Sequence, residues 1–180
     1  MKKVKGKVLI IVDMQNDFID GALANPDAQA IVDPLCEYIK TFDGTSIVCT
    51  RDTHYDNYME TQEGKNLPIP HCIKDTEGWY VNAKIQDTIR KTKIDFDNVN
   101  KRSFGYDDWG DWGFYFLKDP KEFVVVGTCT DICVVSNVLG LKAEFPEVPI
   151  TVISSLCAGL TKEKHEAALE VMRSCQVNVI

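Results

Sequence analysis

The stretch Lys-Val-Leu-Ile-Ile-Val-Asp-Met-Gln-Asn-Asp-Phe, residues 7–18, decides how the chain folds. It opens with a continuous apolar run, and a run without polar alternation is typical of a strand that is covered on both faces of a parallel sheet. A second run of this kind, Phe-Val-Val-Val at residues 123–126, lies much further along the chain. The two runs predict a central parallel sheet with helices packed on both sides.

Apolar runs and stretches of helical spacing alternate through the remaining sequence. We expect strands at residues 7–12, 46–50, 98–101, 122–127, 150–154 and 177–180, and helices at residues 26–42, 83–91, 132–143 and 162–174. Such alternation builds right-handed βαβ units. The sequence therefore predicts one Rossmann-like domain over residues 1–180, with three α/β/α layers and a mostly parallel sheet of about five or six strands.

Charge and hydropathy exclude several classes of partner and location. The net charge is −7 with acidic and basic residues mixed, which argues against nucleic acid or an anionic membrane as the partner. No apolar run approaches the roughly 18–20 residues that span a bilayer. The N-terminus is basic, but the apolar run that follows ends at Asp13 and is too short for a signal peptide. We expect a cytoplasmic protein.

The chain has seven cysteines, an odd number, and no Cys-x-x-Cys pair. In a protein that is not secreted, this pattern argues against a disulfide framework and against a thiolate zinc site. We expect most of these cysteines to be small buried apolar residues, with one or two at most carrying chemistry.

Three reactive side chains follow predicted strands. Asp13 ends the first apolar run, Lys101 ends a short strand in the middle of the chain, and Cys133 lies at the start of a helix just behind the strongest strand. Alone, these residues would be a loop-capping acid, a surface lysine and a core cysteine. Ligands of such folds bind beyond the carboxyl ends of the strands, so together the three predict an active site.

The chemistry of these three groups suits nucleophilic catalysis by a cysteine. A helix N-terminus and the Lys101 ammonium favour a reactive thiolate at Cys133. Asp13 can accept the thiol proton and pass it to a leaving amine. We expect Thr130 and Asp131 to cap the helix.

Three motifs resemble those of the cysteine hydrolase superfamily of nicotinamidases, isochorismatases and N-carbamoyl amidases. They are Asp-Met-Gln-Asn-Asp-Phe at 13–18, Lys-Arg-Ser-Phe at 101–104 and Gly-Thr-Cys-Thr-Asp-Ile-Cys-Val at 127–134. The resemblance runs from about Val8 to Gly159 and implies an isochorismatase-like fold.

The resemblance also assigns roles to individual residues. It implies that Asp13, Lys101 and Cys133 form the catalytic triad. It implies a cis peptide at Thr128–Cys129, and an oxyanion hole made by the backbone N–H groups of Cys129 and Cys133. Cys129 is then a small lining residue and not a nucleophile.

A second group of residues resembles a metal site. Asp52 and His54 are two residues apart at the start of a long polar loop, and His71 follows in the same loop. One carboxylate and two imidazoles suit zinc, iron or manganese, although each residue alone would be a hydrogen-bonded loop residue. The pattern is similar to the metal site of nicotinamidases, some of which add a glutamate. Glu63 is the nearest match for that ligand, and Glu60 is the alternative.

The sequence departs from the nicotinamidases at one substrate position. Many of them carry a tryptophan shortly before the second histidine, whereas this chain has Asn-Leu-Pro-Ile-Pro at residues 66–70. The aromatic candidates for that wall are Phe18, Phe104, Tyr106 and Trp109, and we expect Phe18, Phe104 and Tyr106 to contact substrate. We expect His165, in a charged helix, to lie on the surface.

The resemblance implies hydrolysis of a small primary amide, nicotinamide to nicotinate and ammonia, through a Cys133 thioester. It implies a divalent metal cofactor and a place in NAD metabolism. The expected partner is the small amide alone, and the protein is expected to be a homo-oligomer. Two alternatives stay open: a related hydrolase acting on a carbamoyl, ureido or isochorismate-like substrate, and a non-catalytic binding protein. A dinucleotide-binding protein is disfavoured, because no glycine-rich loop follows the first strand.

Overall fold

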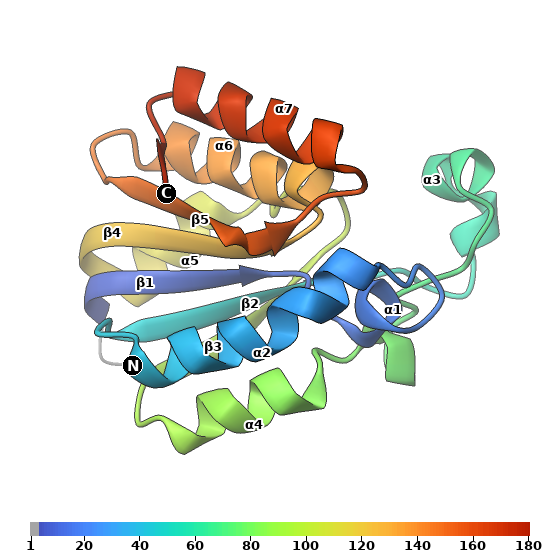
Figure 1. Cartoon of the computed structure of the whole chain (residues 1–180), viewed down its shortest axis with the longest axis horizontal. Helices are drawn as coiled ribbons and strands as arrows, with labels where there is room; N and C mark the ends of the chain where they lie inside the picture. Colours follow the sequence, from blue (N-terminus) through green and yellow to red (C-terminus); the bar gives the residue numbers. More distant parts are fainter. Residues whose placement is uncertain (1–3) are drawn as a thin grey trace.

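The structure, a computed structural model, describes residues 4–180, so the first three residues of the basic N-terminus lie outside the described residues. Over that range the chain forms a six-stranded sheet in the order β3-β2-β1-β4-β5-β6 (Figure 1). Every pair of neighbouring strands is parallel. The strands are β1 (Val4–Val12), β2 (Ser46–Asp52), β3 (Asp95–Lys101), β4 (Leu117–Thr128), β5 (Ile150–Ala158) and β6 (Asn178–Val179).

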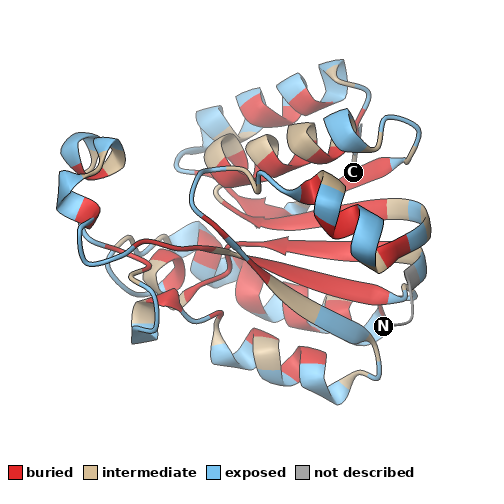
Figure 2. Cartoon of the chain, turned by 180° about the vertical axis from the view of Figure 1, so that it is seen from behind, coloured by how far each residue is buried: buried red, intermediate tan, exposed pale blue. Residues whose placement is uncertain are grey.

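Helices cover both faces of the sheet. One face carries α2 (Pro26–Thr41) and α4 (Ala83–Lys91), and the other carries α5 (Trp109–Phe116), α6 (Val135–Glu144) and α7 (Lys162–Ser174). Figure 2 shows the central strands buried and the outer faces of the helices exposed. This architecture confirms the predicted three-layer α/β/α fold.

The first apolar run explains why both faces are covered. Successive side chains of a strand point to opposite faces. Val8, Ile10 and Val12 pack into the core beneath α5, α6 and α7. Leu9 and Ile11 pack into the second core, beneath α2 and α4.

The sequence pattern missed parts of this architecture. β4 begins at Leu117, five residues before the predicted start, because its first half is polar and contains Pro120 yet still pairs with the start of β1 through shifts in register. Helix α5 was not predicted, and it buries Trp109 and Trp112 in the core. Its aromatic content gives no helical period to read.

The sheet order sets the place of the active site. β3, β2, β1 and β4 are neighbours and run in the same direction, so their carboxyl ends meet at one edge. The segment between β2 and α4 lies beyond this edge and contains three short helices, η1 (Tyr58–Glu60), α3 (Gln62–Asn66) and η2 (Glu77–Trp79). Helix α3 projects beyond the sheet, at the same end of the molecule as the short α1 (Asn16–Ile19) that follows β1 (Figure 1). Within residues 4–180, no helix has the length and apolar character needed to cross a membrane.

Candidate active site

Asp13 lies directly after β1 and is fully buried. Its φ of 49° places it in the left-handed region, which is uncommon for a residue other than glycine. Thr50 of β2 fixes this conformation from the neighbouring strand. The Thr50 hydroxyl donates to Asp13 Oδ1 at 2.6 Å, and the Asp13 backbone N–H lies 3.2 Å from the same hydroxyl oxygen.

Lys101, the last residue of β3, is also fully buried and is the centre of the site. Its Nζ lies 2.8 Å from Asp13 Oδ2 and 3.3 Å from Asp52 Oδ1. The same nitrogen lies 3.6 Å from Cys133 Sγ and donates to the backbone oxygen of Ser103 at 3.1 Å. The structure thus brings together the three residues of the predicted triad from three separate strand ends.

Cys133 lies in η3 (Thr130–Val134), a single π-helical turn between β4 and α6. Asn137 supports this turn, because its Nδ2 donates to the Cys133 carbonyl at 2.8 Å. The Thr128–Cys129 peptide before the turn is cis, as the resemblance implied. The predicted caps are wrong: Thr130 and Asp131 make no cap hydrogen bond at the start of η3, because their side chains bond to the region around α7 instead.

The electrostatics of the resting site differ from the expected depression of the thiol pKa. Burial raises the pKa of Cys133 well above its ordinary value, the charge of Asp13 raises it further, and the Lys101 ammonium only partly offsets both effects. Burial also raises the pKa of Asp13. The Lys101 ammonium lowers this pKa and the charge of Asp52 raises it, and the net result is an increase. The resting thiol is therefore protonated, and Asp13 is a stronger proton acceptor than an exposed aspartate.

Cys133 differs from the other cysteines in having an ammonium next to it. The seven cysteines are all free. Burial raises the pKa of Cys49 and Cys157 to about 12 and that of Cys129 to about 11. Among residues 4–180, Cys133 is the only cysteine whose sulfur accepts a hydrogen bond from a lysine nitrogen. That contact can stabilise a thiolate once a proton acceptor has formed it.

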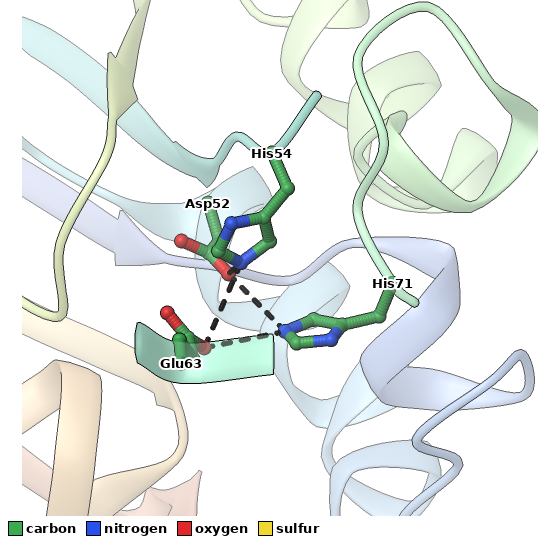
Figure 3. Close-up of side chains that lie close together, drawn as sticks. All are labelled: Asp52, His54, Glu63 and His71. Carbon is green, nitrogen blue, oxygen red and sulfur yellow. Dashed lines mark ion pairs between the residues drawn. The ribbon is translucent and has the colours of Figure 1, made fainter. Parts of the chain in front are cut away.

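Four side chains form a possible metal site beside the triad: Asp52, His54, Glu63 and His71 (Figure 3). Each offers one ligand atom, and these atoms all lie within 4.8 Å of one another. His54 Nε2 is 2.9 Å and His71 Nε2 is 3.5 Å from Asp52 Oδ2, while the same two nitrogens are 3.6 and 3.7 Å from Glu63 Oε1. Glu60, the alternative ligand, is exposed and lies outside this group.

Two observations show that this group suits a metal ion. The His71 Nδ1 lies 2.9 Å from the carbonyl oxygen of Ile69, which makes Nδ1 the protonated nitrogen and leaves a lone pair on Nε2. The His54 Nε2 is buried and makes no hydrogen bond of good geometry. Two imidazole Nε2 atoms facing two carboxylates are a ligand set that zinc, iron and manganese all accept.

Asp52 belongs to both groups. Its Oδ1 faces Lys101 and its Oδ2 faces the two histidines. Burial acts to raise the pKa of Asp52, but the contacts with His54 and His71 and the charge of Lys101 outweigh burial, so the pKa is lowered. Asp52 is therefore ionised in the resting site.

Sequence reasoning missed two residues that orient the metal group, although both lie in the first motif. Gln15 Nε2 donates to the carbonyl of Asp52 at 2.9 Å, and Gln15 Oε1 accepts from the Asp52 N–H at 2.7 Å. Asp17 Oδ2 accepts from the Cys72 N–H at 2.7 Å, directly after His71. The first motif thus supplies Asp13 to the predicted triad and fixes the backbone at Asp52 and next to His71, two members of the possible metal site.

A cavity of about 540 Å³ opens beside both groups. Cys133, Asp52, Glu63 and His71 all line it, and the remaining lining is mainly apolar. Leu67, from the stretch 66–70 that lacks an aromatic residue, also lies on its wall.

The structure places two of the three predicted substrate contacts at this cavity. Phe18 lines it with its ring centroid 5.6 Å from that of His71, and Phe104, which is about half exposed, lines it as well. Tyr106 does not line it, because its ring packs edge-on against Trp109 at 4.9 Å. Trp109 is buried in the core and also lies outside the cavity.

Comparison with known proteins adds to this geometry. A family model described as the isochorismatase domain matches residues 7–180. The chain is 28% identical to the nicotinamidase/pyrazinamidase of Mycobacterium tuberculosis, with 97% of this chain and 98% of that protein covered. Its structure is similar to that of the pyrazinamidase/nicotinamidase from Streptococcus mutans, with 27% identity, a TM-score of 0.83, and 97% and 99% of the two chains covered. It is also similar to the pyrazinamidase of Pyrococcus horikoshii in complex with zinc, with 25% identity, a TM-score of 0.76, and 97% and 98% covered.

Proposed function

The chain belongs to the isochorismatase family as an amidohydrolase, and from that premise we propose that it hydrolyses nicotinamide to nicotinate and ammonia through a thioester on Cys133. The observation that carries the proposal is the position of Lys101, which lies within 4 Å of Asp13, Asp52 and Cys133 at once. It joins a nucleophile and a base to a possible metal group at the end of one cavity. Release of ammonia from nicotinamide by the purified protein is the direct test.

The reaction begins with transfer of the thiol proton from Cys133 to Asp13. The sulfur attacks the amide carbonyl, and the backbone N–H groups of Cys129 and Cys133 hold the resulting oxyanion. Asp13 returns its proton to the nitrogen as the C–N bond breaks, and ammonia leaves. Water then attacks the thioester with Asp13 as base, which releases nicotinate and restores the thiol.

Lys101 keeps the charges of these steps in balance. It offsets the negative charge on Asp13 before proton transfer and that on the sulfur after it. Because it is fully buried, its attraction to both groups is stronger than that of an exposed lysine.

The metal group has a positioning role in this proposal. Asp52, His54, His71 and Glu63 would hold a divalent transition metal. When bound, the ion supplies an open coordination position for the ring nitrogen of the substrate. Phe18 borders the same space and limits how the ring can lie.

Replacing His71 by alanine is expected to remove the metal. Dialysed wild-type protein should contain about one zinc, iron or manganese ion per chain. His71→Ala should contain almost none after dialysis, because it loses one of the two imidazole nitrogens, the ligands that these transition metals prefer over carboxylates. Elemental analysis measures the content. Thermal unfolding with added zinc gives an independent readout, since a ligand that binds the native state raises Tm.

Glu60→Gln is the matched control for this prediction, since Glu60 lies in the same segment but outside the ligand group. It should keep both the metal and the zinc-dependent rise in Tm. Equal metal content in wild type and His71→Ala would leave these four residues with a structural role only.

Substrate comparison tests the role of the ring nitrogen. Nicotinamide and pyrazinamide each carry a nitrogen that can occupy the coordination position, and benzamide does not. The kcat/KM for benzamide should be lower by about 100-fold, because an unanchored ring places the amide poorly over the sulfur.

Two results would contradict this substrate assignment. Equal kcat/KM values for the three amides would remove the anchoring role of the ring nitrogen. Negligible turnover of all three, together with good turnover of a carbamoyl or ureido compound, would place the protein in another branch of its family.

A further inference from the structure

A buried hydroxyl in the turn of the nucleophile bonds to a distant helix. Thr130 is the first residue of η3 and is fully buried. Its Oγ1 lies 2.8 Å from Nδ1 of His165, which belongs to α7. The sequence predicted a surface position for His165, but the structure places it partly buried against this turn. A hydrogen bond between side chains so far apart in the chain ties the position of the turn to that of α7.

The loop that leads into α7 is held against the same turn. Asp131 Oδ1 accepts a hydrogen bond from the Leu160 N–H at 2.9 Å. A Cβ atom added to Gly159 would lie 2.8 Å from Cβ of His165 and 3.1 Å from Asp131 Oδ1. Position 159 thus has no room for a side chain, and the loop before α7 lies close against both His165 and Asp131.

The start of η3 has little other side-chain support. The N–H groups of Ile132 and Val134 both bond to the carbonyl of Cys129, at 3.1 and 3.0 Å, which closes the turn at its backbone. No side chain caps the turn. Asn137 holds its far end through the carbonyl of Cys133. The near end, which directly follows Cys129, is held by the Thr130–His165 contact.

We propose that His165 is a positioning residue of the active site: through Thr130 it fixes the turn that presents the Cys133 sulfur and the backbone N–H groups of the oxyanion hole. The inference rests on the proposed function. His165 touches neither substrate nor sulfur, and it acts by holding the donors where the oxyanion forms. Such donors stabilise a transition state only when they are fixed in advance, within about 0.5 Å.

The test is a set of substitutions at both ends of the contact. Thr130→Val keeps the shape of the side chain and removes the hydroxyl, and His165→Ala removes the ring. Each should lower kcat by about 10- to 100-fold with less than about a threefold change in KM, because ground-state binding of the ring does not use the oxyanion donors. The double variant should be no slower than the slower single variant, since both changes remove the same contact.

Two conservative variants separate positioning from packing. Thr130→Ser keeps the hydroxyl, and His165→Asn places an amide nitrogen near the position of Nδ1. Both should recover most of the lost kcat. Glu166→Gln, the exposed neighbour on α7, is the matched control and should behave as wild type. Thermal unfolding of each variant identifies any that fail to fold.

Several results would overturn the positioning role of His165. The first is an unchanged kcat in folded Thr130→Val and His165→Ala, and the second is additive effects of the two changes in the double variant. The others are a rise in KM as large as the fall in kcat, and failure of Thr130→Ser and His165→Asn to recover activity. The variants are compared on the amide that the wild type hydrolyses fastest, so a preference for another amide contradicts only the substrate assignment. A wild type that hydrolyses no amide overturns both proposals.

Discussion

Cys133→Ala is expected to lose at least about 10⁴-fold in turnover, because the variant lacks the thiol that Lys101 contacts and that forms the proposed thioester. The variant should stay folded, since a small buried side chain is replaced by a slightly smaller apolar one. Ammonia release measures the loss. Mass spectrometry of the quenched wild-type reaction should show a chain heavier by one nicotinoyl group, and the variant should show none.

Cys129→Ala is the matched control, because its thiol lines the same cavity only four residues earlier. The proposed oxyanion hole uses the backbone N–H of Cys129 and not its sulfur, so this variant should keep most of its activity. Substantial turnover by Cys133→Ala, or an acyl group found on another residue, would end the nucleophile assignment.

Asp13→Asn is expected to lower kcat by about 10³-fold, in the range measured when a general acid–base group is removed. The amide is close to the carboxylate in shape but cannot accept the thiol proton. It also leaves the buried Lys101 with Asp52 as its remaining carboxylate, so some loss of stability accompanies the loss of activity. The exposed Asp20→Asn is the control and should be fully active.

The pH dependence of kcat/KM is a second test of Asp13→Asn. Burial and the charge of Asp52 raise the pKa of Asp13. The carboxylate form is the active base, so kcat/KM of the wild type should fall as the pH drops through this raised pKa, above the ordinary range of an aspartate. The residual activity of Asp13→Asn should lack that fall. An identical acidic limb in both proteins would remove Asp13 from the role of base.

The sequence predicted the fold and the site correctly where a residue type recurs at a fixed position in a strand or at its end. Apolar runs located the central strands, and the rule that ligands bind beyond their carboxyl ends selected Asp13, Lys101 and Cys133. The structure places these residues together as that rule requires. Elements without such a pattern were not predicted: the polar first half of β4 and the aromatic helix α5 carry no periodic pattern.

The supporting contacts of the site were beyond the reach of the sequence. Thr50 bonds to Asp13 and His165 bonds to Thr130, and each pair joins elements whose distance along the chain has no characteristic spacing. Tyr106 shows the opposite error. Tyr106 follows the motif that ends with the cavity-lining Phe104, but its ring packs against Trp109 in the core and not against the cavity.

The double use of Asp52 has a consequence for how this site can change over evolutionary time. Its two oxygens face a lysine on one side and two imidazoles on the other, so no substitution at this position alters one neighbour alone. A substitution of Asp52 that removed the proposed metal ligand would also remove one of the two carboxylates next to the buried Lys101. A substitution of His54, His71 or Glu63 would remove a proposed metal ligand and leave the contacts of Lys101 unchanged. If the four residues bind a metal as proposed, lineages that lose it should therefore lose the histidines first and keep Asp52 longest.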